Sequence, residues 1–275
     1  SPPSHCPACG AQIPPWRNVP VFGYLVLRGR AACCGAKLSP RYFVVEVLGG
    51  LLCLACFERW FVMAPSDRDA LPAMVEALLY FAFTGGLLVA TFVDLEWMEI
   101  PDEVSLPGAA LGLMTVALRS SPGAEEAAVG AGLGFLVIQV LFVWGYEALM
   151  GRRGMGEGDS KLLLFIGAFV GWQGALFAIV AGSIQGLVAA GALLATGKPL
   201  TPTRPDELEA EPSAKAEVAE ADSAAKTEGD DGDEEPGEDD GRLRIPFGPF
   251  LALGALEFLF VGDRFIAWYS TLFES

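Results

Sequence analysis

The chain has 275 residues, of which 52% are hydrophobic and 19% are charged, and it contains 33 glycines. This composition is too apolar for an ordinary soluble domain and is typical of a membrane protein. The formal net charge of −16 is mostly local, because residues 205–242 hold 16 of the 34 acidic residues and only 3 basic ones. The rest of the chain is close to neutral, and nothing in it indicates nucleic-acid binding.

Apolar windows long enough to cross a bilayer recur along the chain. Seven predicted transmembrane helices cover residues 42–63, 71–93, 104–119, 127–149, 161–175, 176–196 and 246–262. Windows of about 18 or more apolar residues favour membrane spans, although two of these are short or meet at an ambiguous junction near Gly171–Gly174. Six or eight spans therefore stay open, and we predict an all-α polytopic protein of about seven transmembrane helices.

The windows divide the chain into four predicted parts. These are a cysteine-rich segment at 1–41, membrane helices at 42–197, an acidic loop at 198–245, and a last helix with an outer tail at 246–275. The acidic loop has no aromatic residue and almost no large aliphatic one between residues 205 and 242. It cannot bury enough apolar surface to offset its ordering entropy, which predicts a disordered, solvated spacer. A specific partner for the loop stays open.

The basic residues predict an orientation. With seven spans and the amino terminus in the cytoplasm, 14 of the 18 lysines and arginines lie on the cytoplasmic side. The four others are Arg59, Arg68, Arg119 and Arg264. Because positive charges accumulate on the cytoplasmic side of short loops, this placement favours a cytoplasmic cysteine segment and an outer carboxyl terminus.

The cysteine-rich segment contains two candidate metal-binding turns. The first is CPACG with Cys6 and Cys9, and the second is CCG with Cys33 and Cys34. Four thiolates suit one tetrahedral zinc, which would supply folding energy that so short a segment cannot obtain from a core. A regular second turn would need cysteine where Ala31 stands, so three thiolates with water or His5, or a reduced metal-free segment, stay open.

Two aspartates lie at the ends of apolar helices, where a charge is costly and often functional. Asp94 ends one predicted helix, and Asp159 opens another after Gly156 and Gly158. Side by side at one face of the membrane, they would share a proton and activate water for attack on a peptide carbonyl. The glycines would allow a close approach of the substrate or a partner helix. The alternatives are a helix cap for Asp159 and an interface marker for Asp94.

A third aspartate, Asp102, lies in the same turn as Asp94 and follows Pro101 at the start of a predicted helix. Aspartate is a favoured residue at the cap position that precedes a helix. We therefore predict that Asp102 is a helix cap, and we assign no chemistry to it.

Four motifs in order resemble those of the type IV prepilin peptidases, which are membrane-embedded aspartic proteases with a GxGD signature. They are the CPACG turn with its continuation RGR…CG…SPRYFVVE, the stretch DLEWMEIPDEVSLPG, the GxGD match MGEGDSKLL, and RIPFGPFLALGA before the last span. The resemblance covers nearly the whole chain except the acidic insertion. A lone GxGD would be a weak signal, whereas four elements in the right order are specific.

The resemblance implies an activity and its residues. The catalytic pair would be Asp94 and Asp159, with Gly156 and Gly158 completing the motif. The structural zinc would bind Cys6, Cys9 and Cys34, with Cys33 in place of the cysteine absent at position 31. Members of the family act in the bacterial inner membrane, with the active site facing the cytoplasm. They cut prepilins and pseudopilins after a glycine, and many methylate the new terminus with S-adenosylmethionine. No residues for binding that methyl donor are evident in the sequence.

Two functions of other classes stay open beside the peptidase. One is an ion-coupled membrane carrier in which Asp94 and Asp159 bind cations, and the other is a non-catalytic assembly scaffold for pilus or secretion systems. No charged residue is predicted deep within a span, which favours chemistry at the membrane edge over an ion pathway. The particular substrate and the oligomeric state do not follow from the sequence.

Overall fold

The computed structural model describes residues 4–6, 8–14, 17, 19–151, 156–196 and 246–273, and this part of the chain is mostly helical, with two isolated β-bridges in the cysteine-rich segment. The predicted acidic loop, residues 198–245, lies outside the described residues. The helices in chain order are α1 (Phe22–Val26), α2 (Pro40–Phe57), η2 (Glu58–Val62), α3 (Ala70–Trp97), α4 (Asp102–Met114), η3 (Val116–Leu118), α5 (Ala124–Leu136), η4 (Val137–Gly145), α6 (Tyr146–Met150), α7 (Glu157–Thr196) and α10 (Gly248–Phe273).

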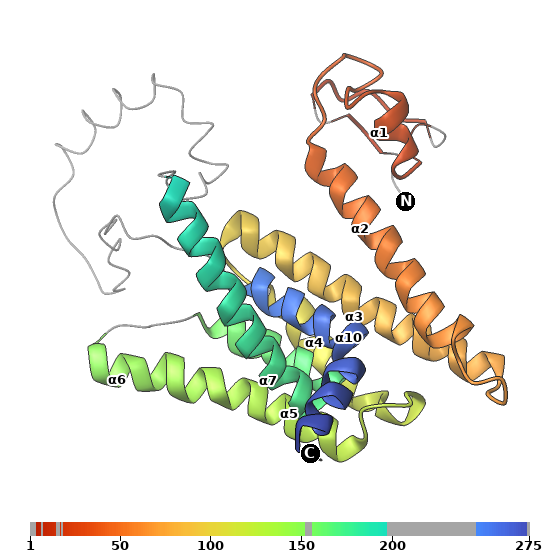
Figure 1. The fold of residues 1–275 in the computed structure, drawn as a ribbon. Coiled ribbons are helices and arrows are strands. Elements are labelled where there is room, and N and C mark those ends of the chain that lie inside the picture. Colours follow the sequence, from red (N-terminus) through yellow and green to blue (C-terminus); the bar gives the residue numbers. More distant parts are fainter. Residues whose placement is uncertain are drawn as a thin grey trace, which may run out of the picture.

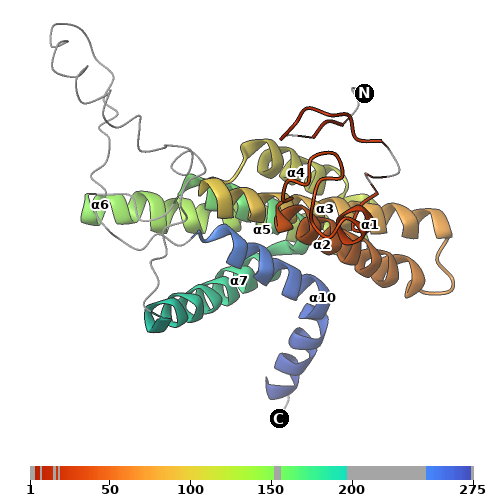
Figure 2. The same ribbon diagram turned by 90° about the horizontal axis from the view of Figure 1, so that it is seen from above.

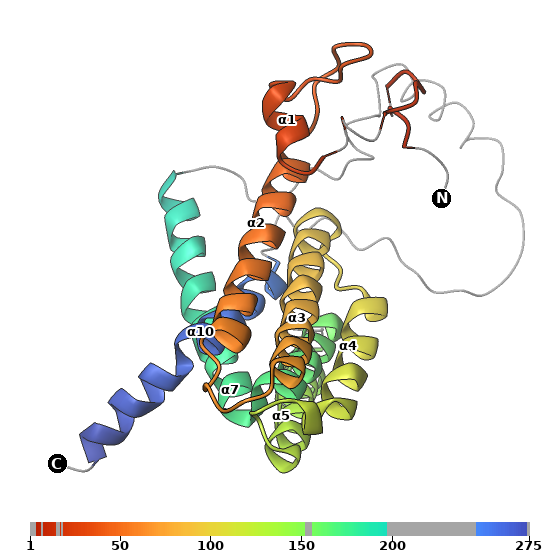
Figure 3. The same ribbon diagram turned by 90° about the vertical axis from the view of Figure 1, so that its right-hand side faces the viewer.

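The long helices form a bundle, and the cysteine-rich segment lies outside it. The segment and α1 lie at the amino-terminal end of α2, at the top of Figure 1 and Figure 3. In the view from above, α3, α4 and α5 lie together, and α7 and α10 extend to one side of them (Figure 2). The main packing partners of α7 are α5, α10 and α4, so α7 is the central element of the bundle.

Four of the described helices are long and apolar enough to cross a membrane. They are Pro40–Val62, Ala70–Trp97, Ala124–Leu149 and Glu157–Ala195, and the apolar stretch Gly248–Gly262 is shorter. The helical fold is confirmed, but the predicted count of seven spans is not. The window predicted at 104–119 contains most of the 13-residue α4, which ends at Met114, and then only the short 3₁₀ helix η3. At 1.5 Å per residue α4 is about 20 Å long, less than the roughly 30 Å hydrocarbon core.

The 40 residues of α7 contain a break at Gly171, whose backbone angles (φ 72°, ψ −176°) are open essentially only to glycine. The atoms nearest to each glycine show that the helix direction reverses at Gly171. Before the break Gly112 of α4 lies against Phe169, whereas after it Gly174 lies near Phe258 and Gly182 near Phe250, so the second half runs antiparallel to α10. The two segments therefore meet close to the junction that the sequence left ambiguous.

Close contact between small residues packs α5 onto the first half of α7. A Cβ atom built on Gly167 would lie 2.2 Å from the carbonyl oxygen of Gly130, so neither position accepts a side chain. Small residues let membrane helices approach closely, since the bilayer supplies little hydrophobic force between them. Beside this contact, Phe83 of α3 stacks on Phe169 of α7 with ring centres 4.6 Å apart, and Phe165 meets both rings edge-on.

Candidate active site and metal centre

Asp94 lies in the last turn of α3 and is 5% exposed. The helix ends at Met98, which is left-handed (φ 55°) and whose amide donates to the carbonyl of Asp94 at 2.9 Å. The carboxylate accepts a hydrogen bond of 2.9 Å from the backbone amide of Gly248, the first residue of α10. Two helices far apart in the sequence therefore hold this side chain.

Asp159 is the third residue of α7 and is 8% exposed. The negative charge of Asp94 acts on the Asp159 carboxylate, so the two groups interact electrostatically. Among the described residues no hydrogen-bond donor contacts the Asp159 carboxylate. The structure thus brings the two predicted aspartates to one end of the bundle, called here the carboxylate end.

The buried side chain of Ile100 lies against the starts of α7 and α10 at the carboxylate end. A Cβ atom on Gly158 would lie 3.0 Å from Cβ of Ile100, and one on Gly248 would lie 3.1 Å from its Cδ1 and 2.6 Å from Oδ2 of Asp94. Gly158 is therefore closely approached, but by Ile100 of the connection between α3 and α4 and not by a helix. At Gly156 the nearest contact is Oδ2 of Asp159 at 3.9 Å, an ordinary separation, so this position shows no comparable crowding.

Gly248 is the residue of the carboxylate end that sequence reasoning missed as a participant. It lies in the stretch RIPFGPFLALGA, which the sequence marks only as a family motif. The signal available was a glycine at the start of an apolar helix, a place where a backbone amide is free of an intrahelical partner. Nothing in the sequence pairs that amide with Asp94, because the two residues are 154 positions apart.

The prediction that Asp102 caps α4 is wrong. Pro101 occupies the cap position, and Asp102 is the first helical residue. Its carboxylate accepts hydrogen bonds of 2.8 and 2.6 Å from Nζ of Lys161 on α7. An ion pair with a neighbouring helix replaces the local cap, and the side chain stays half exposed.

Charged side chains are also buried at the opposite end of the bundle, called here the arginine end. Arg119 is 7% exposed and donates to the carbonyls of Gly112, Ala168 and Phe169 at 2.6, 3.0 and 2.9 Å. The last two carbonyls end the first half of α7, just before the break, where a helix leaves carbonyls without partners. Arg119 therefore caps one helix end and ties it to α4, whereas the sequence predicts only that it ends the span 104–119 on the outer side of the membrane.

Glu76 of α3 is fully buried at the arginine end and accepts several hydrogen bonds. The backbone amide and the hydroxyl of Ser120 donate to it at 2.7 and 2.6 Å, and the Arg68 guanidinium forms an ion pair with it. Since Ser120 follows Arg119 in the chain, these contacts join α3 to the same connection that Arg119 anchors.

The four cysteines of the amino-terminal segment form one cluster. The Sγ atoms of Cys6, Cys9, Cys33 and Cys34 all lie within 4.8 Å of one another, with 3.8 Å between Cys6 and Cys34 and 3.3 Å between Cys9 and Cys33. With metal–sulfur bonds of about 2.3 Å, a tetrahedral zinc site has sulfurs roughly 3.8 Å apart. The cluster could hold a metal ion of this kind. His5 lines a neighbouring cavity and is not part of the cluster.

Two turns with the same hydrogen bonds present these cysteines. In the first turn, the amide of Gly10 donates to the carbonyl of Cys6 at 2.8 Å, and the amide of Cys6 donates to the carbonyl of Ala11 at 2.9 Å. In the second turn, the amide of Gly35 donates to the carbonyl of Ala31, and the amide of Ala31 donates to the carbonyl of Ala36, both at 2.8 Å. Gly10 and Gly35 both have a left-handed backbone. Ala31 therefore takes the place of Cys6, as the sequence spacing indicated, and Cys33 brings the fourth sulfur from a different position of its turn.

The thiols of the cluster differ in how readily they ionise. Hydrogen bonds from the amides of Ala8 and Cys9 lower the pKa of Cys6 to about 7. Hydrogen bonding to Cys9 and then to Cys6 raises the pKa of Cys33 to about 12. Because thiolates are the metal-binding form, a bound cation would favour the ionised state of all four and offset their mutual repulsion.

These observations define a helical membrane protein with two buried carboxylates at one end of its bundle and a thiol cluster outside it. Two sequence-family models match the chain. The "Bacterial Peptidase A24 N-terminal domain" matches residues 1–60, and the "Type IV leader peptidase family" matches residues 81–191. The first match contains the four cysteines, and the second contains both aspartates.

Three curated relatives have the name prepilin leader peptidase/N-methyltransferase. The protein of Pseudomonas putida is 35% identical over 185 residues, 67% of this chain and 60% of that protein. Those of Stutzerimonas stutzeri and Aeromonas hydrophila are 30% and 32% identical over 98% and 99% of this chain, and 75% and 76% of their own lengths. No solved structure matches the chain. The chain belongs to the type IV leader peptidase family.

Proposed function

We propose that the chain is a prepilin leader peptidase that cuts type IV prepilins or pseudopilins after the glycine of the leader and then N-methylates the new terminus. The observation that carries the proposal is the placement of Asp94 and Asp159 at one end of the bundle, where both are buried and the charge of Asp94 acts on Asp159. Family membership and the names of the relatives support the same activity.

In the proposed mechanism the two carboxylates share one proton, because two adjacent negative charges are costly in a buried site. The amide of Gly248 donates to Asp94, a contact that suits an ionised carboxylate, so Asp94 is the base and Asp159 the acid. Asp94 takes a proton from water while Asp159 donates its proton to the scissile carbonyl. When the resulting intermediate collapses, the C–N bond breaks and the proton held by Asp94 passes to the leaving amine, while one hydroxyl of the intermediate returns a proton to Asp159 as the carboxylic acid forms.

The second activity acts on the amine that cleavage releases. S-adenosylmethionine would supply the methyl group. Its methyl–sulfur bond would break with the electron pair left on sulfur as the neutral amine nitrogen takes up the methyl carbon, and the methylated ammonium would then lose one proton to water. The thiol cluster takes no part in either reaction, and we assign it one structural zinc held by Cys6, Cys9, Cys33 and Cys34.

The proposed setting is the bacterial inner membrane, with the carboxylate end and the cysteine segment facing the cytoplasm. The distribution of lysine and arginine along the sequence supports this orientation. The apolar stem of the prepilin would lie among the membrane helices, and its leader would reach the carboxylate end. Glycine before the cleaved bond suits a site as crowded as the surroundings of Gly158 and Gly248, where the side chains of Ile100 and Asp94 leave no room for a Cβ atom.

The test is cleavage of a purified prepilin by the detergent-solubilised protein. Asp94→Asn and Asp159→Asn should each lower the rate by about 10³-fold or more, since each removes one partner of the proton transfer. Asp102→Asn is the matched control, because this aspartate lies at the same end but pairs with Lys161. It should keep the rate within a fewfold of the original. Substantial processing by either of the first two variants would exclude the paired mechanism.

The same assay separates the peptidase from its rivals, because neither a carrier nor a scaffold shortens a prepilin. The buried charges of the described residues gather at the two ends of the bundle, at Asp94 and Asp159 and at Glu76 and Arg119. Among the described residues no buried charge lies between these two ends, so the distribution favours chemistry at one end over a pathway lined by ionisable groups.

A further inference from the structure

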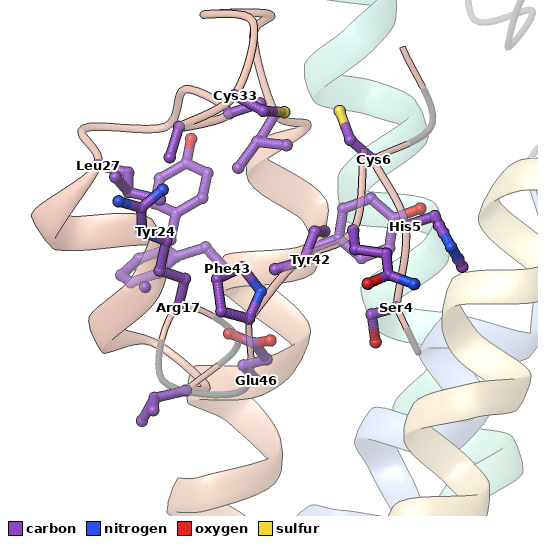
Figure 4. Close-up of a pocket in the computed structure, with 18 residues that line it drawn as sticks. Ser4, His5, Cys6, Arg17, Tyr24, Leu27, Cys33, Tyr42, Phe43 and Glu46 are labelled. Carbon is purple, nitrogen blue, oxygen red and sulfur yellow. The ribbon is translucent and has the colours of Figure 1, made fainter. Parts of the chain in front are cut away.

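A cavity of about 370 Å³ lies between the cysteine-rich segment and the first turns of α2 (Figure 4). Cys6 and Cys33 line it from the segment, and Tyr42 and Glu46 line it from α2. Its size is that of a pocket for a small organic molecule, for which about 300–1,000 Å³ is usual. Neither Asp94 nor Asp159 lines it, so it is a second site, separate from the proposed peptidase centre.

One wall of the cavity is aromatic. The rings of Tyr24 and Phe43 stack on one another with centres 5.1 Å apart and planes 26° apart, and both line the cavity. Because one residue comes from α1 and the other from α2, the stack also fixes α1 on α2. A flat apolar wall of this kind suits a planar heteroaromatic group.

The cavity also presents one positive and one negative side chain. Arg17 and Glu46 both line it, and both are labelled in Figure 4. The carboxylate of Glu46 is held in place, since its Oε2 accepts a hydrogen bond of 2.7 Å from the backbone amide of Val21. A guanidinium and a fixed carboxylate beside an aromatic wall match a ligand that has both a carboxylate and a cation.

The backbone at this hydrogen bond is strained. Val21 has φ 63° and ψ −53°, and the amide of Phe22 donates to the carbonyl of Pro20 at 2.6 Å, which closes a γ-turn of the strained kind. A β-branched residue rarely adopts a positive φ. Such strain persists only where the surrounding structure fixes the backbone, and strained residues are frequent at binding and catalytic sites. Here the bond to Glu46 ties the strained turn to the charged group of the cavity.

The cavity lies on the same side of the bundle as the carboxylate end. Nη1 of Arg41, the neighbour of Tyr42, lies 3.0 Å from Oε1 of Glu96. Glu96 is in the last turn of α3, which also carries Asp94. An amine released at the carboxylate end would therefore form beside the base of the cysteine-rich segment.

We propose that this cavity binds the methyl donor S-adenosylmethionine, an inference that rests on the proposed N-methyltransferase function. The Tyr24–Phe43 wall holds the adenine. Arg17 binds the carboxylate of the amino-acid part of the ligand, and Glu46 binds its ammonium group. The two chemical steps then use separate parts of the chain, with cleavage in the bundle and methyl transfer in the segment outside it.

The experiment measures equilibrium binding of S-adenosylhomocysteine, the demethylated donor, to the full chain by calorimetry, with prepilin cleavage measured on the same samples. Arg17→Gln and Glu46→Gln should each weaken binding by about tenfold or more, because each removes a charge-assisted contact. Glutamine at position 46 retains an oxygen that accepts from Val21. Cleavage should stay within twofold, since the aspartates are unchanged.

Arg30→Gln and Glu58→Gln are matched controls, because both residues are exposed and neither lines the cavity. Both should bind the probe like the original protein. Tyr42→Ala removes a lining side chain that is 72% exposed, so it tests the cavity with little risk to folding, and it should weaken binding severalfold.

Unchanged affinity in the three cavity variants would overturn the proposal, as would equal losses in the controls or no binding by the original protein. An original protein that binds the probe but does not cut prepilin would instead overturn the peptidase and leave the donor site standing.

Discussion

The arginine end and the carboxylate end of the bundle both contain buried charged side chains, but these side chains differ in how many hydrogen bonds they form. At the arginine end, Arg119 donates to three backbone carbonyls and Glu76 accepts from Ser120 and Arg68. At the carboxylate end, Asp94 accepts one hydrogen bond from the amide of Gly248, and no described donor contacts the carboxylate of Asp159. The buried charges of the arginine end have several hydrogen-bond partners each, whereas the two acids of the carboxylate end have one hydrogen bond from a described donor between them.

The difference indicates a division of roles. A buried charge with several hydrogen bonds holds helices together and has little freedom to exchange a proton. A pair of buried acids with few other partners is poorly stabilised, yet it has lone pairs and a proton available for a substrate. The arginine end therefore stabilises the bundle at the break in α7, and the carboxylate end retains the reactive groups.

The largest effect on stability is expected at Arg119. Arg119→Met should lower the free energy of unfolding by on the order of 3–5 kcal/mol, because three buried carbonyls lose a charged donor. Arg119→Lys should recover only part of the loss, since one ammonium does not reproduce the guanidinium fork. The measurement is denaturant unfolding in detergent micelles, with Arg264→Met at an exposed position as the control. An Arg119→Met protein as stable as the original would remove the distinction between the two ends.

The next effect tests the carboxylate end. Gly248→Ala should reduce prepilin cleavage by about 100-fold with little loss of stability. The new methyl carbon would lie 2.6 Å from Oδ2 of Asp94, so the carboxylate must rotate away from its partner. A Cβ atom at Gly132 of α5 meets nothing within 4 Å, which makes Gly132→Ala the matched control. Full activity of the Gly248 variant would mean that the position of Asp94 is not critical.

Metal removal should have a smaller effect on cleavage. We expect one zinc per chain in the purified protein, and chelation should make the segment before α2 sensitive to protease, because a segment of this size depends on its metal to fold. Cleavage should fall only a fewfold, because the aspartates lie on α3 and α7, outside the segment. Cys6→Ser should act in the same way. A protein that contains no zinc, or one whose cleavage stops on chelation, would contradict this separation.

Several features of the molecule follow from the sequence for simple physical reasons. Long apolar windows predict helices, and the helical fold and the family are confirmed. Charged residues at the ends of those windows mark Asp94 and Asp159, and the structure places both at one end. The short spacing of the cysteines likewise predicts the cluster, including the unusual Cys33. The catalytic and metal roles of these residues stay predictions.

What the sequence does not reveal depends on long-range geometry. Arg119 is the last residue of an apolar window, and a basic residue at that place is typical of a membrane surface, so nothing in the sequence predicts its bonds to Ala168 and Phe169 of α7. The bond from Gly248 to Asp94 uses a backbone amide, which has no signature in the sequence. In both cases a side chain meets the backbone of a distant helix, and no local pattern encodes such a pairing.

The smallest expected effect concerns the ion pair between Asp102 and Lys161, which lies at the carboxylate end but at its surface. A double-mutant cycle with Asp102→Asn and Lys161→Gln should give a coupling energy below about 1 kcal/mol, because exposed ion pairs gain little over hydrated charges. High salt should reduce it further. A coupling energy of about 3 kcal/mol would show that this end also depends on paired charge for its stability, and the contrast with Arg119 and Glu76 would then fail.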